Sequence, residues 1–168
     1  SEDVVDKYTV SYDNKTVDDF TITNTHVPEV TSVNVTKVWD DDGNRDGVRP
    51  VSVVVHLLAD GKINQTVVLN ASNSWKYTFA NLLVYNNGKK IKYNFSEDVV
   101  DKYTVSYDNK TVDNFTITNT HVPEVTSVNV TKVWVDDGNR DGVRPVSVVV
   151  NLLADGKINQ TVVLNASN

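Results

Sequence analysis

The chain of 168 residues contains neither cysteine nor methionine. The absence of cysteine excludes a disulfide framework and a metal site built on thiolates. A small β-domain without disulfides needs another source of rigidity. Positive charge is also scarce, because the net charge is -6 and the pI is about 4.9. This balance gives nucleic-acid binding no electrostatic basis, so we expect no nucleic-acid partner.

Long apolar runs are missing as well. The longest, VSVVVHLLA at 51–59, is too short to span a bilayer. We find no basic amphipathic face, signal peptide or anchor in the sequence. We therefore predict no membrane insertion in this region.

The chain repeats itself with a period of 95 residues. Residues 1–73 and 96–168 are identical at 70 of 73 positions. The three differences are Asp19/Asn114, Asp40/Val135 and His56/Asn151. Near-identical long repeats indicate domains arranged in series.

The repeat predicts one complete module and two partial ones. The segment ITNTHVPEVTSV occurs twice and places a proline after a strand-like run, which is typical of a short, stiff connector. We place the complete module at 29–121. Residues 1–28 are then the C-terminal part of one module and residues 122–168 the N-terminal part of another. Both lack a counterpart of 74–95, so we expect neither to close its own core.

Hydrophobic alternation with a period of two runs through the complete module, and no segment shows a helical period. It predicts seven short strands, separated by turn sequences at 59–62, 85–90 and 107–110. The pattern favours an all-β sandwich with antiparallel pairing and one solvent-exposed face per sheet. The predicted inward faces are Val33–Trp39, Val53–Leu57, Gln65–Leu69, Trp75–Phe79, Ile91–Phe95, Tyr103–Tyr107 and Phe115–Ile117.

Three polar side chains extend these inward faces. Lys37 lies between Val35 and Trp39, whereas Glu97 and Asn119 each continue an apolar face at the end of a strand. Burial of such groups is costly unless they have partners, and it lowers the pKa of a lysine and raises that of a carboxylic acid. A neutral amine next to a protonated acid can attack a side-chain amide and release ammonia.

This chemistry would join Lys37 to Asn119 by an isopeptide bond, with Glu97 moving the protons. A second interpretation explains the same pattern. Lys37 and Glu97 would form an ion pair at the rim of the sandwich, and Asn119 would bond to a turn. Both interpretations stay open from the residues alone.

The order of motifs resembles the Cna protein B-type (CnaB) repeat of bacterial surface adhesins and pilins. The stretches that carry the resemblance are VTKVWDDDGNRDGVRPVSVVVHLLADGK, WKYTFANLLVYNNGKKIKYNFSE and FTITNTHVPE. The resemblance implies a prealbumin-like (transthyretin-like) β-sandwich. It also implies a self-formed isopeptide bond between a lysine of the first strand and an asparagine of the last, promoted by a glutamate. Carried over by motif, these residues are Lys37, Asn119 and Glu97.

The partial modules carry the equivalents Glu2, Asn24 and Lys132, whose partners lie outside this sequence. The resemblance implies no cofactor and a location at the cell surface, with attachment to the cell wall through a region outside this sequence. The expected partners are neighbouring repeats of the same chain and a host-surface ligand of the full-length protein.

The turn DDDGNRDG at 40–47 matches the first half of a calcium-binding loop, with Asp42, Asn44 and Asp46 at ligand positions. The glutamate of position twelve is missing, since Val53 occupies that position. A solvated acidic turn is the favoured interpretation, and weak calcium binding is the alternative.

The sequence bears on three classes of function. Near-identity between repeats favours a structural stalk or spacer, which needs copies and not distinct sites. The alternative is an adhesive module that recognises a host protein or glycan through loops or a sheet edge. An enzyme acting on external substrates is disfavoured, because we find no nucleophile and base apart from the inward-facing trio of Lys37, Glu97 and Asn119. The histidines show no pairing and are expected at the surface: His26, His56 and His121.

Overall fold

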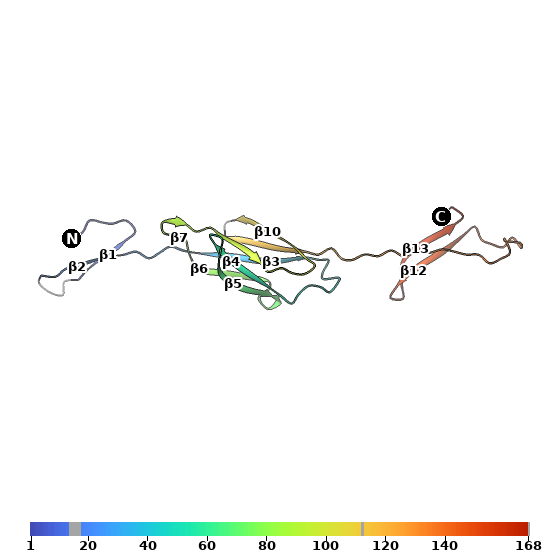
Figure 1. The fold of residues 1–168 in the computed structure, drawn as a ribbon, viewed down its shortest axis with the longest axis horizontal. Helices are drawn as coiled ribbons and strands as arrows, with labels where there is room; N and C mark the ends of the chain where they lie inside the picture. Colours follow the sequence, from blue (N-terminus) through green and yellow to red (C-terminus); the bar gives the residue numbers. More distant parts are fainter. Residues whose placement is uncertain (14–17, 112, 168) are drawn as a thin grey trace. The chain divides into compact units, whose positions relative to one another are not determined.

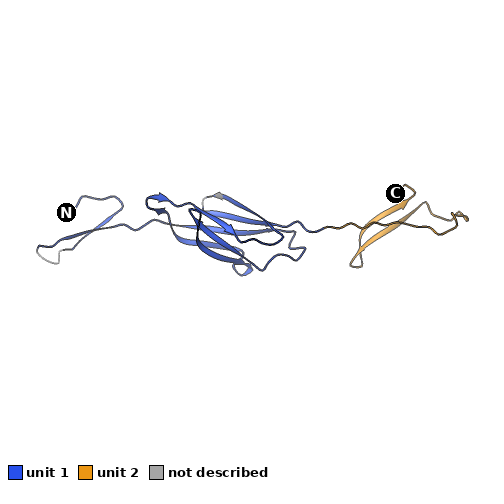
Figure 2. Ribbon diagram, in the orientation of Figure 1, with its two compact units in different colours: residues 1–124 blue, residues 125–168 orange. Residues whose placement is uncertain are grey.

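The computed structural model describes residues 1–13, 18–111 and 113–167. The chain divides into two compact units, residues 1–124 and 125–168 (Figure 2). The described residues form strands and one short 3₁₀ turn without any α-helix, which confirms the all-β class. No helix in this part of the chain has the length and apolar character needed to cross a membrane.

Unit 1 contains all seven strands predicted for the complete module (Figure 1). The structure adds a short hairpin that was not predicted, formed by β7 and β8, which have two residues each. The strands of residues 29–121 are β3 (Val30–Asp40), β4 (Ser52–Ala59), β5 (Lys62–Asn70), β6 (Lys76–Leu83), β7 (Tyr85–Asn86), β8 (Lys89–Lys90), β9 (Tyr93–Glu97), β10 (Thr104–Thr111) and β11 (Asn114–Thr120); the 3₁₀ turn η1 (Ala71–Asn73) follows β5.

These strands form the two layers of a sandwich. One sheet has the order β10-β11-β3-β6 and the other the order β5-β4-β9. Both contribute to one hydrophobic core, which shows that the sheets pack face to face. The buried apolar side chains are Val33, Val35, Val53, Val55, Leu57, Leu69, Phe79, Leu82, Phe95, Phe115 and Ile117.

Two predicted turns have the backbone geometry that their residues favour. Asp60 and Gly61 both have positive φ, 49° and 82°, and join β4 to β5. Asn87 and Gly88, at 48° and 75°, do the same between β7 and β8. Positive φ at both central residues matches the twist of a hairpin and suits Asp-Gly and Asn-Gly.

The turn predicted at 107–110 is wrong. Strand β10 continues to Thr111, and the register with β11 shifts between Asp108 and Thr111. Val105 and Tyr107 lie on the predicted inward face, opposite buried Asn119 and Ile117, but they are not fully buried, at 44% and 45% exposed. Strand β10 is the edge of its sheet, so its inward side chains are less completely covered than those of β11 and β3.

Antiparallel pairing holds throughout the module except between its first and last strands. Strands β3 and β11 pair in parallel, with Lys37 opposite Ile117 and Asn119 opposite Trp39. Alternation reports only that one face of a strand is buried, and it carries no information on strand direction. The whole module separates these two strands, so a tight turn does not force them to run antiparallel.

The repeat copies outside residues 29–121 keep the same local pairings. Strands β1 (Thr9–Asp13) and β2 (Thr21–Thr25) form a hairpin, as β10 and β11 do. In unit 2, β12 (Ser147–Ala154) and β13 (Lys157–Asn165) pair as β4 and β5 do, including the register shift. The division into one complete and two partial modules remains a prediction.

Candidate functional site

The lysine on the inward face of β3 is buried, as its place in the alternation predicts. Lys37 as a residue is 4% exposed. Its Nζ donates to the carbonyl oxygens of Val38 at 3.4 Å and of Ile117 at 3.5 Å. The second of these contacts directs the amine toward β11, the strand that carries Asn119.

The glutamate reaches this amine from the opposite sheet. Glu97 ends β9, and its side chain is 1% exposed. Its Oε1 lies 3.3 Å from Lys37 Nζ, so the two groups form a buried ion pair. The backbone N–H of Glu97 donates to the hydroxyl of Tyr107 at 3.0 Å, which fixes the end of β9 against β10.

The asparagine is the most isolated of the three. Asn119 is 0% exposed, and neither its Oδ1 nor its Nδ2 has a hydrogen-bond partner among the described residues. It lies on the inward face of β11, two residues beyond the position opposite Lys37. An orphaned buried polar group costs about 1–3 kcal/mol and calls for an explanation. A hydrogen bond to a turn, the second sequence interpretation, does not supply it.

Burial lowers the pKa of Lys37 from 10.5 to about 8. Removal of the ammonium from water is the larger effect, and the charge and hydrogen bond of Glu97 act in the opposite direction. Loss of the proton from Lys37 is therefore easier than in an exposed lysine. Lys37 and Glu97 are thus a nucleophile and a proton carrier in contact, and the carboxamide of Asn119 is buried on the same face of the neighbouring strand.

The equivalents in the repeat copies show parts of the same arrangement. Asn24 Nδ2 donates to Glu2 Oε1 at 2.7 Å, so the asparagine and glutamate positions lie within hydrogen-bonding reach of one another. Lys132 is exposed in unit 2, and its Nζ donates to the carbonyl oxygen of Val133.

The candidate calcium ligands bond to protein donors. Asp42 pairs with Arg45 at 2.5 Å, and Asn44 Oδ1 accepts the backbone N–H of Arg49. Asp46 Oδ2 accepts from His121 and from the backbone N–H of residue 124. In the described residues no cluster of acidic or histidine side chains suits a metal ion. The interpretation of this turn as a solvated acidic loop remains a prediction.

His121 is less exposed than expected. The side chain of His121 is only 9% exposed, because it packs between Asp46 and the ring of Tyr103. Asp46 comes from a loop far away in the sequence, so the linker sequence alone gave no sign of this contact.

A polar network next to Lys37, Glu97 and Asn119 was not predicted from the sequence. Asp41 is 2% exposed and pairs with Arg49, and its Oδ2 also accepts the hydroxyl of Tyr103 at 2.8 Å. Arg49 holds the pKa of Asp41 well below its usual range. Burial, more than Asp41, raises the pKa of Tyr103 to about 12. Asp41 stands two residues after Trp39, so extending the alternation of β3 by one step would have indicated it.

The sandwich fold and the sequence motifs together point to one class of repeat domain. A family model, the Cna protein B-type domain, matches residues 33–120 and 128–168. The chain belongs to this family. The likeness seen in the motifs is thereby confirmed, as is the sandwich fold.

Among its relatives, the collagen adhesin of Staphylococcus aureus is 44% identical over 162 residues, which are 96% of this chain and 13% of the adhesin. The crystal structure of two B repeat units (B1B2) of the collagen binding protein of S. aureus matches with a TM-score of 0.65 and 42% identity. That match covers 98% of this chain and 43% of the solved chain. A single B1 unit of the same surface protein gives a TM-score of 0.52 at 44% identity, covering 83% and 72%. The chain is thus similar to repeat units that form a small part of a surface adhesin.

Proposed function

We propose that Lys37 and Asn119 form an intramolecular isopeptide bond, promoted by Glu97, and that the bonded module is a structural stalk repeat of a cell-surface adhesin or pilus-like protein. One observation carries the proposal. The amine, the carboxylate and the unpartnered carboxamide are buried together where the first strand pairs with the last.

The reaction balances without a cofactor. A proton passes from the Lys37 ammonium to the Glu97 carboxylate, across the 3.3 Å contact between them. The neutral amine attacks Cγ of Asn119, and the protonated acid polarises the carboxamide oxygen. The Nζ–Cγ bond forms and the Cγ–Nδ2 bond breaks. Nδ2 leaves as ammonia with a proton that Glu97 relays from the attacking amine.

The stalk role is supported by the similarity of the repeats and by the relatives. The three differing positions of the repeats avoid the core, since Asp40, His56 and Asn114 are not buried. Selection for packing and spacing explains copies of this kind better than selection for distinct binding sites. The relatives are units of a collagen-binding surface protein. We infer a place outside the cell for this chain too, held at the cell wall through a region beyond this sequence.

The test is the intact mass of the purified 168-residue chain. We expect a mass lower than the sequence mass by one ammonia molecule, and a cross-linked peptide containing Lys37 and Asn119 after digestion. Lys37→Ala and Asn119→Ala should each restore the full sequence mass. Glu97→Gln should slow or prevent the loss.

A matched control is Lys132→Ala, which removes the equivalent lysine of unit 2 and should leave the mass loss unchanged. A folded wild-type chain with the full sequence mass would contradict the proposal. In that case the trio would be a buried ion pair next to an asparagine.

A further inference from the structure

The amine of Lys37 lies against an indole ring. Its Nζ is 4.6 Å from the centroid of the Trp39 ring, and the guanidinium carbon of Arg49 is 5.5 Å from the same ring. Trp75 and Tyr103 meet this indole edge-on, at 5.3 and 5.1 Å. Trp39 Nε1 is buried without a hydrogen-bond partner among the described residues. The indole therefore occupies space that water would otherwise fill beside the amine.

A fully paired carboxylate fixes the arginine beside this ring. Arg49 Nε donates to Asp41 Oδ2 at 2.8 Å, and Nη2 donates to Oδ1 at 2.5 Å. The backbone N–H of Asn44 also donates to Asp41 Oδ1, at 2.9 Å, and Tyr103 donates to Oδ2. A two-point arginine–carboxylate pair restricts orientation as well as distance. The pair thus defines where the guanidinium meets Trp39.

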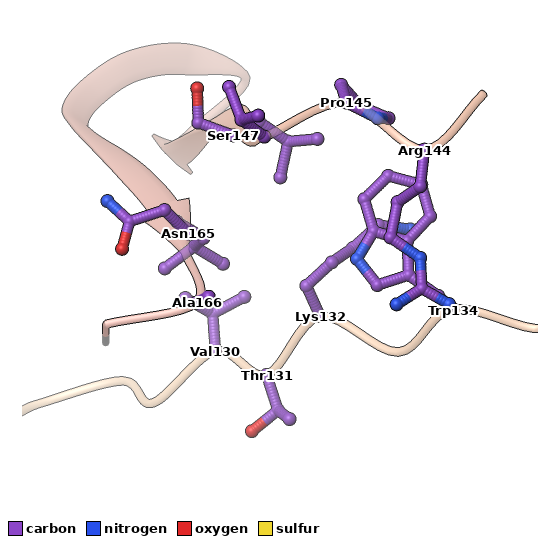
Figure 3. Close-up of a pocket in the computed structure, with 12 residues that line it drawn as sticks. Val130, Thr131, Lys132, Trp134, Arg144, Pro145, Ser147, Asn165 and Ala166 are labelled. Carbon is purple, nitrogen blue, oxygen red and sulfur yellow. The ribbon is translucent and has the colours of Figure 1, made fainter. Parts of the chain in front are cut away.

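The repeat copy in unit 2 supplies an independent observation. Lys132 Nζ lies 4.5 Å from the Trp134 ring and the Arg144 guanidinium 5.6 Å from it. Asp136 pairs with Arg144 through the same two donors. Figure 3 shows Lys132, Trp134 and Arg144 gathered on one side of a hollow. Among the described residues of unit 2 there are no counterparts of β9, β10 and β11. In unit 2 the stack therefore forms within residues 132–144, which contain no strand, and without those last strands.

We propose that the Asp41–Arg49 pair is a positioning clamp, which sets Trp39 over the Lys37 amine before the last strands dock. Tyr103 then closes the cover, because it arrives just before β10 and contacts both Trp39 and Asp41. Trp39, Asp41, Arg49 and Tyr103 are thus positioning residues for the bond-forming reaction. This inference rests on the proposed isopeptide bond.

The charged groups around the amine are few. Glu97 approaches from β9, and the Asp41–Arg49 pair lies in the loop after β3. Tyr103, from the segment before β10, also packs on the indole and is titratable. A clamp that only supported its loop would change stability. A clamp that shields the amine also changes the pH at which the amine loses its proton.

The experiment follows bond formation in newly made 168-residue chains. Short pulses of cell-free synthesis are quenched in acid at set times, and the fraction that has lost ammonia is read by mass. Asp41→Asn and Arg49→Gln should slow the reaction at least about tenfold, since small misplacements of reacting groups are costly. The fall in rate at high pH should move to higher pH in both variants.

Matched controls come from the same loop. Asp42→Asn and Arg45→Gln remove an exposed pair and should leave both the rate and the pH profile at wild-type values. Tyr103→Phe keeps the ring and removes only the hydroxyl, so it reports on the clamp should Asp41→Asn fail to fold. It should give a smaller slowing in the same direction.

The possible outcomes separate the two proposals. Wild-type rates and pH profiles in Asp41→Asn and Arg49→Gln would overturn the clamp and leave the isopeptide bond standing. A slower reaction with an unshifted pH profile would also overturn it, by assigning the pair to loop support alone. If the wild-type chain itself retained its ammonia, the proposed bond would fail first and the clamp with it.

Discussion

A buried lysine, glutamate and asparagine make an expensive cluster for a small β-sandwich. The ion pair of Lys37 and Glu97 loses hydration on both sides, and Coulomb attraction often only balances that loss. Asn119 adds two polar atoms without partners. An amide bond would remove the lysine charge and one of the orphaned groups at once. Two of these three costly residues, Lys37 and Asn119, are therefore the ones that the proposed reaction consumes.

The rate of bond formation should depend on pH through the single proton that Lys37 and Glu97 share. The reactive pair, a neutral amine with a protonated acid, carries the same number of protons as the ion pair. Since the pKa of Lys37 is about 8, the rate should fall as the pH rises through about 8 and this proton is lost. Quenched time courses between pH 6 and pH 10, read by mass, measure the profile.

Circular dichroism at each pH is the control for that profile, because the chain must stay folded over the whole range. A rate that kept rising above the pKa of the amine would show that the amine alone limits the reaction. Glu97 would then have no part as the acid.

At the scale of elements, the end of β11 is fastened to the loop after β3. His121 Nε2 contacts Asp46 Oδ2 at 2.9 Å, and Nδ1 contacts the carbonyl oxygen of Lys102 at 2.9 Å. Both partners are acceptors, so both ring nitrogens can donate only when the imidazole is charged. Asp46 also accepts the N–H of Glu124, which holds the linker beyond the strand.

This fastening should weaken as the pH rises. The hydrogen bond to Asp46, more than that to Lys102, raises the pKa of His121 above its ordinary 6.5. A raised folded-state pKa gives stability that is complete below the unfolded value and is lost as the pH rises through the folded one. We expect Asp46→Asn to lower the pKa of His121 and to reduce stability more at pH 6 than at pH 9. NMR titration of the ring and urea unfolding at both pH values measure these effects.

Asp42→Asn is the matched control for that substitution, because Asp42 pairs with exposed Arg45 in the same loop. An unchanged His121 titration in Asp46→Asn would contradict the role of Asp46. Hydrogen exchange at the Glu124 amide gives a second readout, and it should become faster above the transition.

Most of the elements were predictable because local sequence decides them. Alternation fixed the strands with buried faces, and Asp60-Gly61 fixed the turn between β4 and β5. Alternation also predicted the inward orientation of Lys37, because an apolar residue precedes it and another follows it on the same face of β3. The edge position of β10 was not predictable, because exposure there depends on which sheet lies opposite.

The parallel pairing and the clamp needed the three-dimensional structure. Strand direction between β3 and β11 depends on the connections of the whole module. Asp41 and Arg49 are eight residues apart in a loop without a period, and Tyr103 joins them from 62 residues beyond Asp41. The repeat copy was nevertheless informative, because it showed that part of the clamp forms locally.

At the scale of the whole molecule, the proposed bond changes how the module resists unfolding. Lys37 and Asn119 are 82 positions apart in the sequence. By analogy with a disulfide that closes such a loop, the bond should stabilise the fold by about 4–5 kcal/mol through chain entropy. The larger consequence is mechanical, because force enters the module through β3 and leaves it through β11. These strands are adjacent and parallel, so a pull on the two ends shears them past each other.

Force applied to the two ends of the wild-type chain should therefore leave nearly the whole module folded. With Lys37 bonded to Asn119, force passes across the bond, and the residues between them stay folded and unextended. In Asn119→Ala the same pull should release the enclosed segment, which spans roughly 270–300 Å at about 3.3–3.6 Å per residue. Single-molecule force spectroscopy on the 168-residue chain, held at its two ends, measures this step.

Lys132→Ala should behave as wild type, because its lysine lies outside the enclosed segment. An unfolding step of the full length in a wild-type chain whose mass shows the lost ammonia would mean that the bond joins other residues than these two.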